Sequence, residues 1–338
     1  MLSRVANSLY WMSRYIERAE NTARLVDTNL QLLLDFRNLD DAALSDHWMP
    51  IVQSTGDEGG FLAKYKQATG VSVTEFMVFD AANPNSIASS IAQARENARM
   101  VRDQITVEVW EELNRLYLWT RSAEARRLWM QSPTDFFAHI KNSSMLLLGL
   151  TYATVVHNEG WQFMQAGKFL ERGDKTTRIL DVRHQTFPER GVPAGISQRD
   201  VLEWGAVLRS CSSWDAYKAA YGAEVRPEWA LELLLFSDEF PRSVRFCIEK
   251  LDEALRKISG APPRRFSNAA EKLSGRLLAE LEYGTVEEVL ACGVHGYLDL
   301  LQQKFNTLGQ ALFDAYIFRP FMNLEDEILV QQEMQQQQ

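Results

Sequence analysis

Acidic and arginine side chains recur at helical spacing in two stretches of this 338-residue sequence. The eight residues of these two ladders are Glu17, Arg18, Glu20, Arg24, Glu171, Arg172, Asp174 and Arg178. Paired carboxylates and guanidinia can hold an anionic or zwitterionic ligand, or they can form a salt-bridge lattice that docks two helices. A carboxylate with a raised pKa could instead act as a general acid or base. Because a neighbouring arginine lowers the pKa of a carboxylate, acid–base catalysis is the least favoured of these uses.

Helical geometry places most ladder residues on one charged face. At about 100° per residue, the face of the first helix comprises Ser13, Glu17, Glu20, Arg24 and Asp27. For one helix alone, the spacing from Glu20 to Arg24 indicates an ordinary solvated pair. Arg18 and Arg172 lie off this face, beside the apolar stripe, so we expect their guanidinia to be partly buried and paired. Because the ladder occurs twice, we place the docking lattice ahead of the ligand pocket.

The two ladders are part of a longer internal repeat. Residues 13–27 align with residues 167–181 at an offset of 154, without a gap. Further matches follow in the same order, such as Pro84 with Pro241 at an offset of 157. An offset that grows slowly along the chain is what small loop insertions produce. We therefore infer an ancestral duplication, which places the two ladders on helices related by a pseudo-twofold axis.

The elements expected around the ladders are all helical. Apolar residues at helical spacing predict helices at residues 3–38, 84–103, 106–130 and 136–156. The stretch 41–70 is expected to be rich in loops, and residues 70–73, the best strand candidate, are also expected to be a loop. The sequence thus predicts an all-α helical bundle of two tandem repeats. The expected boundaries are a single domain at 1–330, repeat units near 3–130 and 157–318, and a disordered glutamine-rich tail at 331–338.

Composition and charge exclude several classes of function. Hydrophobic residues make up 46% of the chain, which is ample material for a core. The formal net charge is −9, so nucleic acid is not an expected partner. The most apolar run, residues 145–156, is too short to span a bilayer, so no membrane is expected. Three widely spaced cysteines, Cys211, Cys247 and Cys292, indicate reduced thiols. Together with the lack of a recognisable signal peptide, they predict a cytoplasmic protein.

The sequence carries no clear motif for a metal or a cofactor. Of its five histidines, only His184 follows an acid, Asp181, at the spacing of a carboxylate-bridged di-metal site. The corresponding position of the first unit is Leu30, so the second half of such a site is missing. Glycine-rich nucleotide-binding motifs are also absent. We therefore expect neither a metal nor a cofactor.

At the paired ladders the sequence resembles the alpha-E domain family, all-α proteins named for a Glu-Arg signature. The segments that carry the resemblance are residues 14–24, 94–103, 109–114 and 160–172. The resemblance implies a bacterial setting beside an ATP-grasp-type ligase and often a transglutaminase-like peptidase. It also implies a part in an amide- or peptide-forming system, with the activity of the family itself not established.

Two features qualify how symmetric a site at the ladders can be. The second ladder has Gly173 and Lys175 where the first has alanine and asparagine, so a site that is symmetric in detail is not expected. Arg99 and Arg102 follow on the next helix of the first unit. They could add to a basic pocket, or they could equally lie on a solvated helix face.

Three functions are compatible with these observations. The first is an accessory or co-catalytic partner of an ATP-grasp-type ligase, with the Glu/Arg residues binding a peptide-like or anionic group or the partner itself. The second is a stand-alone enzyme that uses the ladder carboxylates as acid or base and the arginines as substrate clamps. The third is a non-catalytic assembly scaffold.

Overall fold

The computed structural model describes residues 1–35, 41–183, 198–262 and 265–317. Every regular element in these ranges is helical, which confirms the predicted all-α class. The first eight helices are α1 Ser3–Asp35, α2 Asp41–Gln53, α3 Glu58–Lys64, α4 Gly70–Thr74, α5 Ile87–Met100, α6 Val107–Thr120, α7 Ala123–Gln131 and α8 Pro133–Thr154. The others are α9 Glu159–Asp181, α10 Gln198–Ser210, α11 Trp214–Tyr221, α12 Pro227–Phe236, α13 Val244–Ser259, α14 Ala269–Tyr283, α15 Val286–Cys292 and α16 Val294–Leu312. Two π-helical turns are Glu75–Phe79 and Phe313–Ile317.

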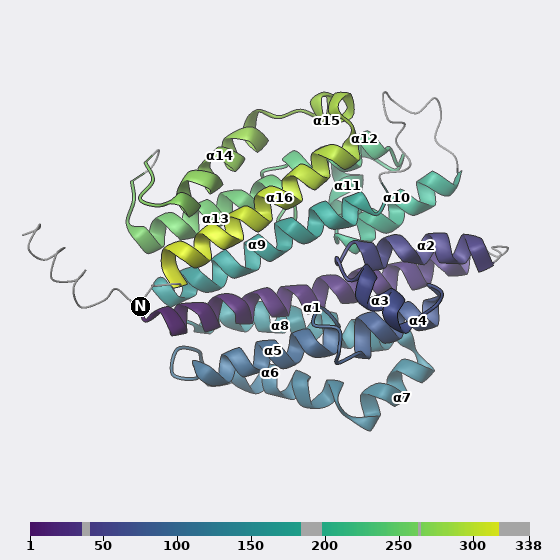
Figure 1. The fold of residues 1–338 in the computed structure, drawn as a ribbon, viewed down its shortest axis with the longest axis horizontal. Helices are drawn as coiled ribbons and strands as arrows, with labels where there is room; N and C mark the ends of the chain where they lie inside the picture. Colours follow the sequence, from purple (N-terminus) through teal and green to yellow (C-terminus); the bar gives the residue numbers. More distant parts are fainter. Residues whose placement is uncertain (36–40, 184–197, 263–264, 318–338) are drawn as a thin grey trace, which may run out of the picture.

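Helices α1 and α9 form the centre of the molecule and run side by side in the same direction (Figure 1). Near their beginnings the pair is so close that a Cβ atom on Gly167 would lie 2.2 Å from the Tyr10 carbonyl oxygen. Beyond the C-terminal end of α9, Arg183 Nη2 donates to Asn29 Oδ1 at 3.2 Å. A glycine at position 167 is therefore required for this contact, because any side chain would push the two helices apart.

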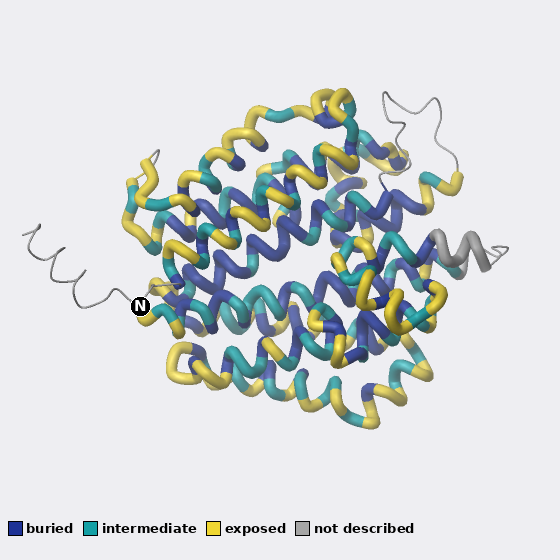
Figure 2. The backbone as a smooth tube through the Cα atoms, viewed as in Figure 1, coloured by how far each residue is buried: buried dark blue, intermediate teal, exposed yellow. Residues whose placement is uncertain are grey.

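Each central helix has its own covering layer. Helices α5 and α8 pack on α1, whereas α13 and α16 pack on α9 (Figure 1). Buried apolar residues from both sides form one continuous hydrophobic core. Figure 2 shows that α9 is buried along nearly its whole length. The charged faces of the two central helices consequently meet protein rather than open water.

The caps that the sequence offers locate several helices. Ser86 accepts a hydrogen bond from the Ser89 amide at 3.1 Å and starts α5. Ser132 accepts one from the Asp135 amide at 3.4 Å, with Pro133 in the first position of α8. The predicted first helix, 3–38, is confirmed from Ser3 to Asp35. Its last residues and the tail at 331–338 lie outside the described residues.

Three predictions along the first half of the chain are wrong. The stretch expected to be rich in loops contains α2, α3 and α4, and residues 70–73 are helical rather than a loop. A reciprocal capping box between Thr69 and Ser72 starts α4, and such short helices depend on caps more than on apolar periodicity. The single helix expected at 106–130 is divided in two, because Ser122 caps a new helix at Ala123.

Candidate functional site

The two ladders meet as a reciprocal exchange of ion pairs between α1 and α9. Arg172 donates to Glu17 from Nε at 2.7 Å and from Nη2 at 3.0 Å. In the opposite direction, Arg18 donates to Glu171 from Nε at 2.7 Å and from Nη2 at 3.1 Å. Each helix therefore gives the other one carboxylate and the guanidinium that follows it in sequence. Both contacts are bidentate, the geometry in which a guanidinium binds a carboxylate most strongly.

These pairs lie in the interior of the protein. The side chains of Glu17 and Glu171 are each 1% exposed, and those of Arg172 and Arg18 are 9% and 13% exposed. The expectation that both arginines are partly buried and paired is confirmed. The alternative of two solvated helix faces is wrong, because the faces with these residues form the contact between the helices. Removing one partner of a buried ion pair of this kind typically destabilises a protein by about 3–5 kcal/mol.

The arginines keep the central carboxylates ionised. Burial by itself raises the pKa of Glu17, but Arg172 and Arg242 outweigh burial and lower the pKa to about 2. Burial also opposes ionisation of Glu171, and Arg18 and Arg14 bring its pKa well below the usual range. A general acid or base near neutral pH needs the opposite shift. The sequence-based expectation that neighbouring arginines lower the pKa is thus confirmed for both residues.

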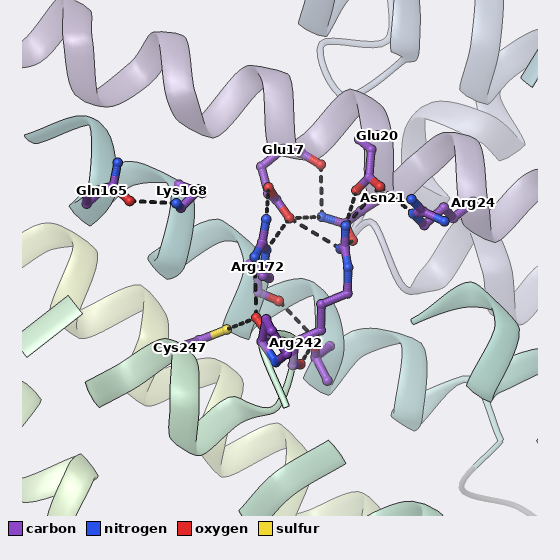
Figure 3. Close-up of polar contacts among 11 residues, drawn as sticks. Glu17, Glu20, Asn21, Arg24, Gln165, Lys168, Arg172, Arg242 and Cys247 are labelled. Atoms are coloured by element: carbon purple, nitrogen blue, oxygen red, sulfur yellow. Dashed lines mark hydrogen bonds and ion pairs between the residues drawn. The ribbon is translucent and has the colours of Figure 1, made fainter. Parts of the chain in front are cut away.

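On the α1 side, an arginine from a distant part of the chain completes the network (Figure 3). Arg242 Nη2 donates to both carboxylate oxygens of Glu20 at 2.8 Å. Its Nη1 donates to Asn21 Oδ1 at 3.0 Å and to Glu17 Oε1 at 3.3 Å. Glu20 also forms an ion pair with Arg24 in its own helix. Every carboxylate oxygen on this side therefore has a donor.

On the α9 side, the residue aligned with Arg242 is Asn85. Its side chain turns elsewhere: Oδ1 accepts from Arg18 Nη1 at 2.8 Å, and Nδ2 donates to the carboxylate of Asp57 at 2.9 Å. Asp174 is bonded to Arg178 of its own helix at 2.8 Å, and the described residues provide no distant guanidinium as a further partner. Its Oδ1 is buried and has no hydrogen-bond partner in the same part of the chain. The two sides of the centre are therefore chemically different.

We call the central network the Glu-Arg cluster. It consists of Arg14, Glu17, Arg18, Glu20, Arg24, Glu171, Arg172, Asp174, Arg178 and Arg242. Six guanidinia in this cluster face four carboxylates, so the buried centre is positive in a chain whose formal net charge is −9. Sequence reasoning missed Arg14 and Arg242. The signal for both was the repeat alignment, in which they pair with Lys168 and Asn85.

Two lysines of α9 add to this positive charge. Burial, reinforced by Arg172, lowers the pKa of Lys168 to about 8, and its ammonium donates to Gln165 at 2.5 Å. Burial also lowers the pKa of Lys175. Unlike Lys168, Lys175 forms no hydrogen bond or ion pair with any residue that the structure describes. An ammonium in this state is poorly solvated and has no counter-ion in contact.

Two candidate residues do not join the cluster. Arg99 forms an ion pair with Glu96 at 2.9 Å, and its side chain is 54% exposed. The guanidinium of Arg102 lies 4.7 Å from the ring centre of Trp110. Both contacts belong to the outer surface of α5 and α6. Of the two interpretations left open for these arginines, the solvated helix face fits the structure.

The fold and the site define an all-helical protein in which two central helices exchange Glu-Arg pairs. The sequence model of the Alpha-E family, described as "a predicted alpha-helical domain with a conserved ER motif", matches residues 1–317. The chain belongs to this family, which confirms the resemblance. The two glutamate–arginine dipeptides are the residues that form the reciprocal ion pairs between α1 and α9.

The chain is also similar to longer, uncharacterized mycobacterial proteins. One from Mycobacterium bovis and one from Mycobacterium tuberculosis are each 27% identical over 315 residues, covering 87% of this chain and 34% of the relative. A protein of a second Mycobacterium tuberculosis strain is 26% identical over the same length. The chain thus spans about a third of the length of these relatives. No solved structure matches it.

Two further properties concern membranes and metals. Within the described ranges, no helix combines the length and the apolar character needed to cross a bilayer. In the same part of the chain, no three His, Cys, Asp or Glu side chains come together as a possible metal site.

Proposed function

We propose that this protein is a non-catalytic helical partner of an ATP-grasp-type amide or peptide ligase. In this proposal the Glu-Arg cluster locks α1 and α9 together, and the molecule presents a binding surface and a bound group to the ligase. The link to an ATP-grasp-type enzyme comes from the family resemblance of the ladders. A transglutaminase-like protein is a second proposed partner on the same ground.

The burial and ionisation of the central carboxylates support a non-catalytic role. Glu17 and Glu171 are each 1% exposed and bound by two or more arginines, with lowered pKa values. Acid–base catalysis by the cluster would need a carboxylate that gains and loses a proton near neutral pH. A lattice that positions two helices needs the permanently ionised, paired groups found here.

The surface of α8 supports a protein partner. Met145, Leu146 and Tyr152 are 42%, 47% and 70% exposed, and positions 145 and 152 are two helical turns apart on α8, while Val156, just after this helix, is 73% exposed. Exposed apolar side chains that gather on one surface often mark a protein interface. The relatives support the same view, because in them a region similar to this chain is joined to about twice as much further sequence.

The proposal includes two inferences about origin and location. Helices α5 and α13 both follow a Pro-x-Ser segment and pack on equivalent central helices, which supports the duplication into units near 3–130 and 157–318. Cys211, Cys247 and Cys292 are free thiols, which supports a reducing, cytoplasmic setting.

The test measures association with an ATP-grasp-type ligase, which the family resemblance leads us to expect beside this protein's gene. We expect the two proteins to co-elute in gel filtration and this chain to change the ATP turnover of the ligase. Tyr152→Glu should weaken association at least about tenfold, because it places a charge in the proposed apolar interface. Leu118→Glu, at a 59% exposed apolar position on α6, is the matched control. The proposal is contradicted if the two proteins do not associate and the ATP turnover of the ligase does not change.

A further inference from the structure

Helices α13 and α14 pack against each other on the α9 side of the molecule, whereas α8 packs on α1 (Figure 1). A cavity of about 510 Å³ lies between α13 and α14, within the range of small-molecule sites, about 300–1,000 Å³. The groups that matter for its chemistry are the side chains of Arg265, Phe266, Lys272, Arg276 and Glu282 and the backbone of Gly275. These residues belong neither to the Glu-Arg cluster nor to the apolar surface of α8, so the proposed function does not account for them.

Three cations line this cavity without an acidic partner. Arg265, Lys272 and Arg276 form no ion pair with any residue that the structure describes. Lys272 and Arg276 are four residues apart on α14, so their like charges are neighbours on one face of the helix. Such a pair is unfavourable by itself. An anion bound between the two side chains would replace this repulsion with attraction.

A network with little exposure to solvent builds the floor of the cavity. Asp252 of α13 forms an ion pair with Arg256 and accepts a hydrogen bond from Ser274 Oγ of α14 at 2.6 Å. Arg256 also donates to the carbonyl oxygens of Pro262 and Arg265. The ion pair therefore fixes the backbone of Arg265 at the edge of the cavity. Asp252 is occupied within the protein and does not compete for the three cations.

A second anchor follows on the other side of Phe266. Ser267 donates to the Glu271 carboxylate from its amide at 2.7 Å and from its hydroxyl at 2.8 Å. Phe266 is thus held between two fixed points, although its side chain is 56% exposed. The ammonium of Lys272 lies 5.4 Å from the centre of the Phe266 ring. An aromatic surface and a cation are therefore presented side by side.

Gly275 keeps the wall of the cavity open on α14. Glycine in the interior of a helix is less favourable than alanine. A Cβ atom on Gly275 would lie 3.4 Å from Arg256 Nη2, which is an ordinary contact with the end of a flexible side chain. Packing therefore does not require glycine here. Its effect is to leave space beside Lys272 and Arg276, where a ligand can approach the helix closely.

Charge and size together indicate the kind of ligand. Two guanidinia and an ammonium suit a phosphate group, because arginine binds phosphate oxygens in a bidentate manner and lysine adds a point charge. A carboxylate carries a single negative charge and would leave more of the positive charge uncompensated. Inorganic phosphate would leave most of the 510 Å³ empty, and Phe266, Leu278 and Ala279 give the cavity an apolar part.

We propose that this cavity binds a phosphate ester with an aromatic body, its phosphate on Arg265, Lys272 and Arg276 and its ring against Phe266. Glu282 lies six residues beyond Arg276, about 9 Å along the helix at 1.5 Å per residue. Its carboxylate therefore faces the body of the ester rather than the phosphate. This site goes beyond the proposed function, because it requires neither the ligase nor the α8 surface.

The test is calorimetric titration of the isolated full-length protein with phenyl phosphate, inorganic phosphate, benzoate and benzyl alcohol. We expect saturable binding of phenyl phosphate. Inorganic phosphate lacks the ring and benzoate has a single charge, so each should bind at least about fivefold more weakly. Benzyl alcohol lacks the charge and should bind at least about tenfold more weakly.

Three results of this titration would overturn the proposal. Inorganic phosphate that binds as tightly as phenyl phosphate would mean an adventitious ion only. Benzoate or benzyl alcohol that binds as tightly would show that the cavity does not select a phosphate. Phenyl phosphate without saturable binding would leave the cavity without its ligand.

Two arginine variants provide a matched comparison. Arg276→Gln should weaken binding of phenyl phosphate at least about tenfold, because it removes one charge-assisted contact. Arg127→Gln removes the same charge at an exposed position on α7 and should change binding by less than about twofold. Thermal unfolding of each variant establishes that it is folded. Equal effects would show that phenyl phosphate responds to overall charge rather than to this cavity.

Gly275→Leu tests the cavity without a change in charge. The leucine side chain would occupy the space beside the helix, so binding of phenyl phosphate should fall at least about tenfold. Leucine favours a helix more than glycine does, so the midpoint of thermal unfolding should stay the same or rise. A loss of binding is therefore distinguished from a loss of folding. Unchanged binding in this variant would place the phosphate elsewhere on the molecule and contradict the assignment.

Discussion

The carboxylates of α1 and those of α9 have different surroundings, although the two ladders are nearly the same in sequence. Glu17 and Glu20 are enclosed by Arg172 and by Arg242, which comes from the segment before α13. On the other side, the corresponding segment supplies Asn85, which turns away from Asp174. One side is therefore a completed salt-bridge lattice, and the other keeps a buried carboxylate oxygen, Asp174 Oδ1, without a hydrogen-bond partner among the described residues.

The comparison shows that two ladders of similar sequence can have different chemical surroundings. Both sides keep the reciprocal ion pairs of the two Glu-Arg dipeptides. The docking of α1 and α9 therefore does not depend on the different surroundings of the two ladders. The difference lies in the residues around them, with Arg242 against Asn85 and Asn21 against Lys175. Because an unpaired buried polar group is costly, we expect these changes to make the α9 side contribute less to stability than the α1 side.

The largest expected effect is the removal of the arginine that closes the α1 side. Arg242→Met should lower the free energy of unfolding by about 3–5 kcal/mol, because it takes the second cation from buried Glu20. Asn85→Ala should cost only about 1–2 kcal/mol, the usual loss of hydrogen bonds to charged groups. Urea denaturation followed by circular dichroism measures both. Arg99→Met, on the exposed surface, is the control, with an effect within about 0.5 kcal/mol. Equal losses for positions 242 and 85 would show that the two sides do not differ as described.

Acid should weaken the lattice over a definite pH range. The pKa of Glu17 is about 2 in the folded protein and 4.5 as an unperturbed group. A lowered folded pKa contributes stability that is present above about pH 4.5 and is lost as the pH falls toward 2. The contribution is about 3 kcal/mol. Unfolding free energies measured from pH 6 to pH 2.5 should therefore fall less steeply for Glu17→Gln than for the natural sequence. The same slope for both proteins would contradict the burial and pairing of Glu17.

A double-mutant cycle should detect the coupling across the central helices. Glu17→Gln combined with Arg172→Met should destabilise the protein by about 2 kcal/mol less than the sum of the single changes, because the double variant leaves neither buried charge without its partner. The exposed pair Glu96 and Arg99 provides a reference cycle, with an expected coupling below about 1 kcal/mol. Strict additivity at Glu17 and Arg172 would mean that their contact contributes nothing to docking.

The smallest expected change in stability comes from making the α9 side resemble the α1 side. Asn85→Arg combined with Lys175→Asn reproduces the residues around Glu20, and we expect unfolding free energy to stay within about 1 kcal/mol. Urea denaturation measures the free energy of unfolding of this double variant. A loss of more than about 2 kcal/mol would show that the α9 side cannot accept the guanidinium that closes the α1 side.

Much of the fold could be predicted from the sequence because it depends on local signals. The apolar spacing of the first 35 residues specified α1, and the apolar spacing within residues 84–103 and 136–156 located α5 and α8. The short helices α2, α3 and α4 were missed, since glycines and acids in that stretch resemble a loop. There, tertiary packing and a local capping box override weak helical propensity.

The candidate site was predictable in its residues but not in its arrangement. The position of Arg18 and Arg172 beside the apolar stripe correctly indicated partial burial and pairing. The same reasoning could not find Arg242, which lies 225 residues from Glu17 in the chain. The same reasoning also could not separate Arg99 and Arg102 from the cluster. The presence of a basic residue on a helix does not reveal whether that face of the helix is buried or exposed to solvent.

The sequence by itself determined the helical class, the two ladders and their repetition, because periodicity and spacing are properties of neighbouring residues. Only the tertiary structure decided that the ladders face each other in a buried interior and that Arg242 closes one side. It also decided that Lys175, beside Asp174, has no ion pair among the described residues. The physical reason is that burial and electrostatic pairing depend on what covers a side chain. Here the covering groups come from residues that are more than a hundred positions away.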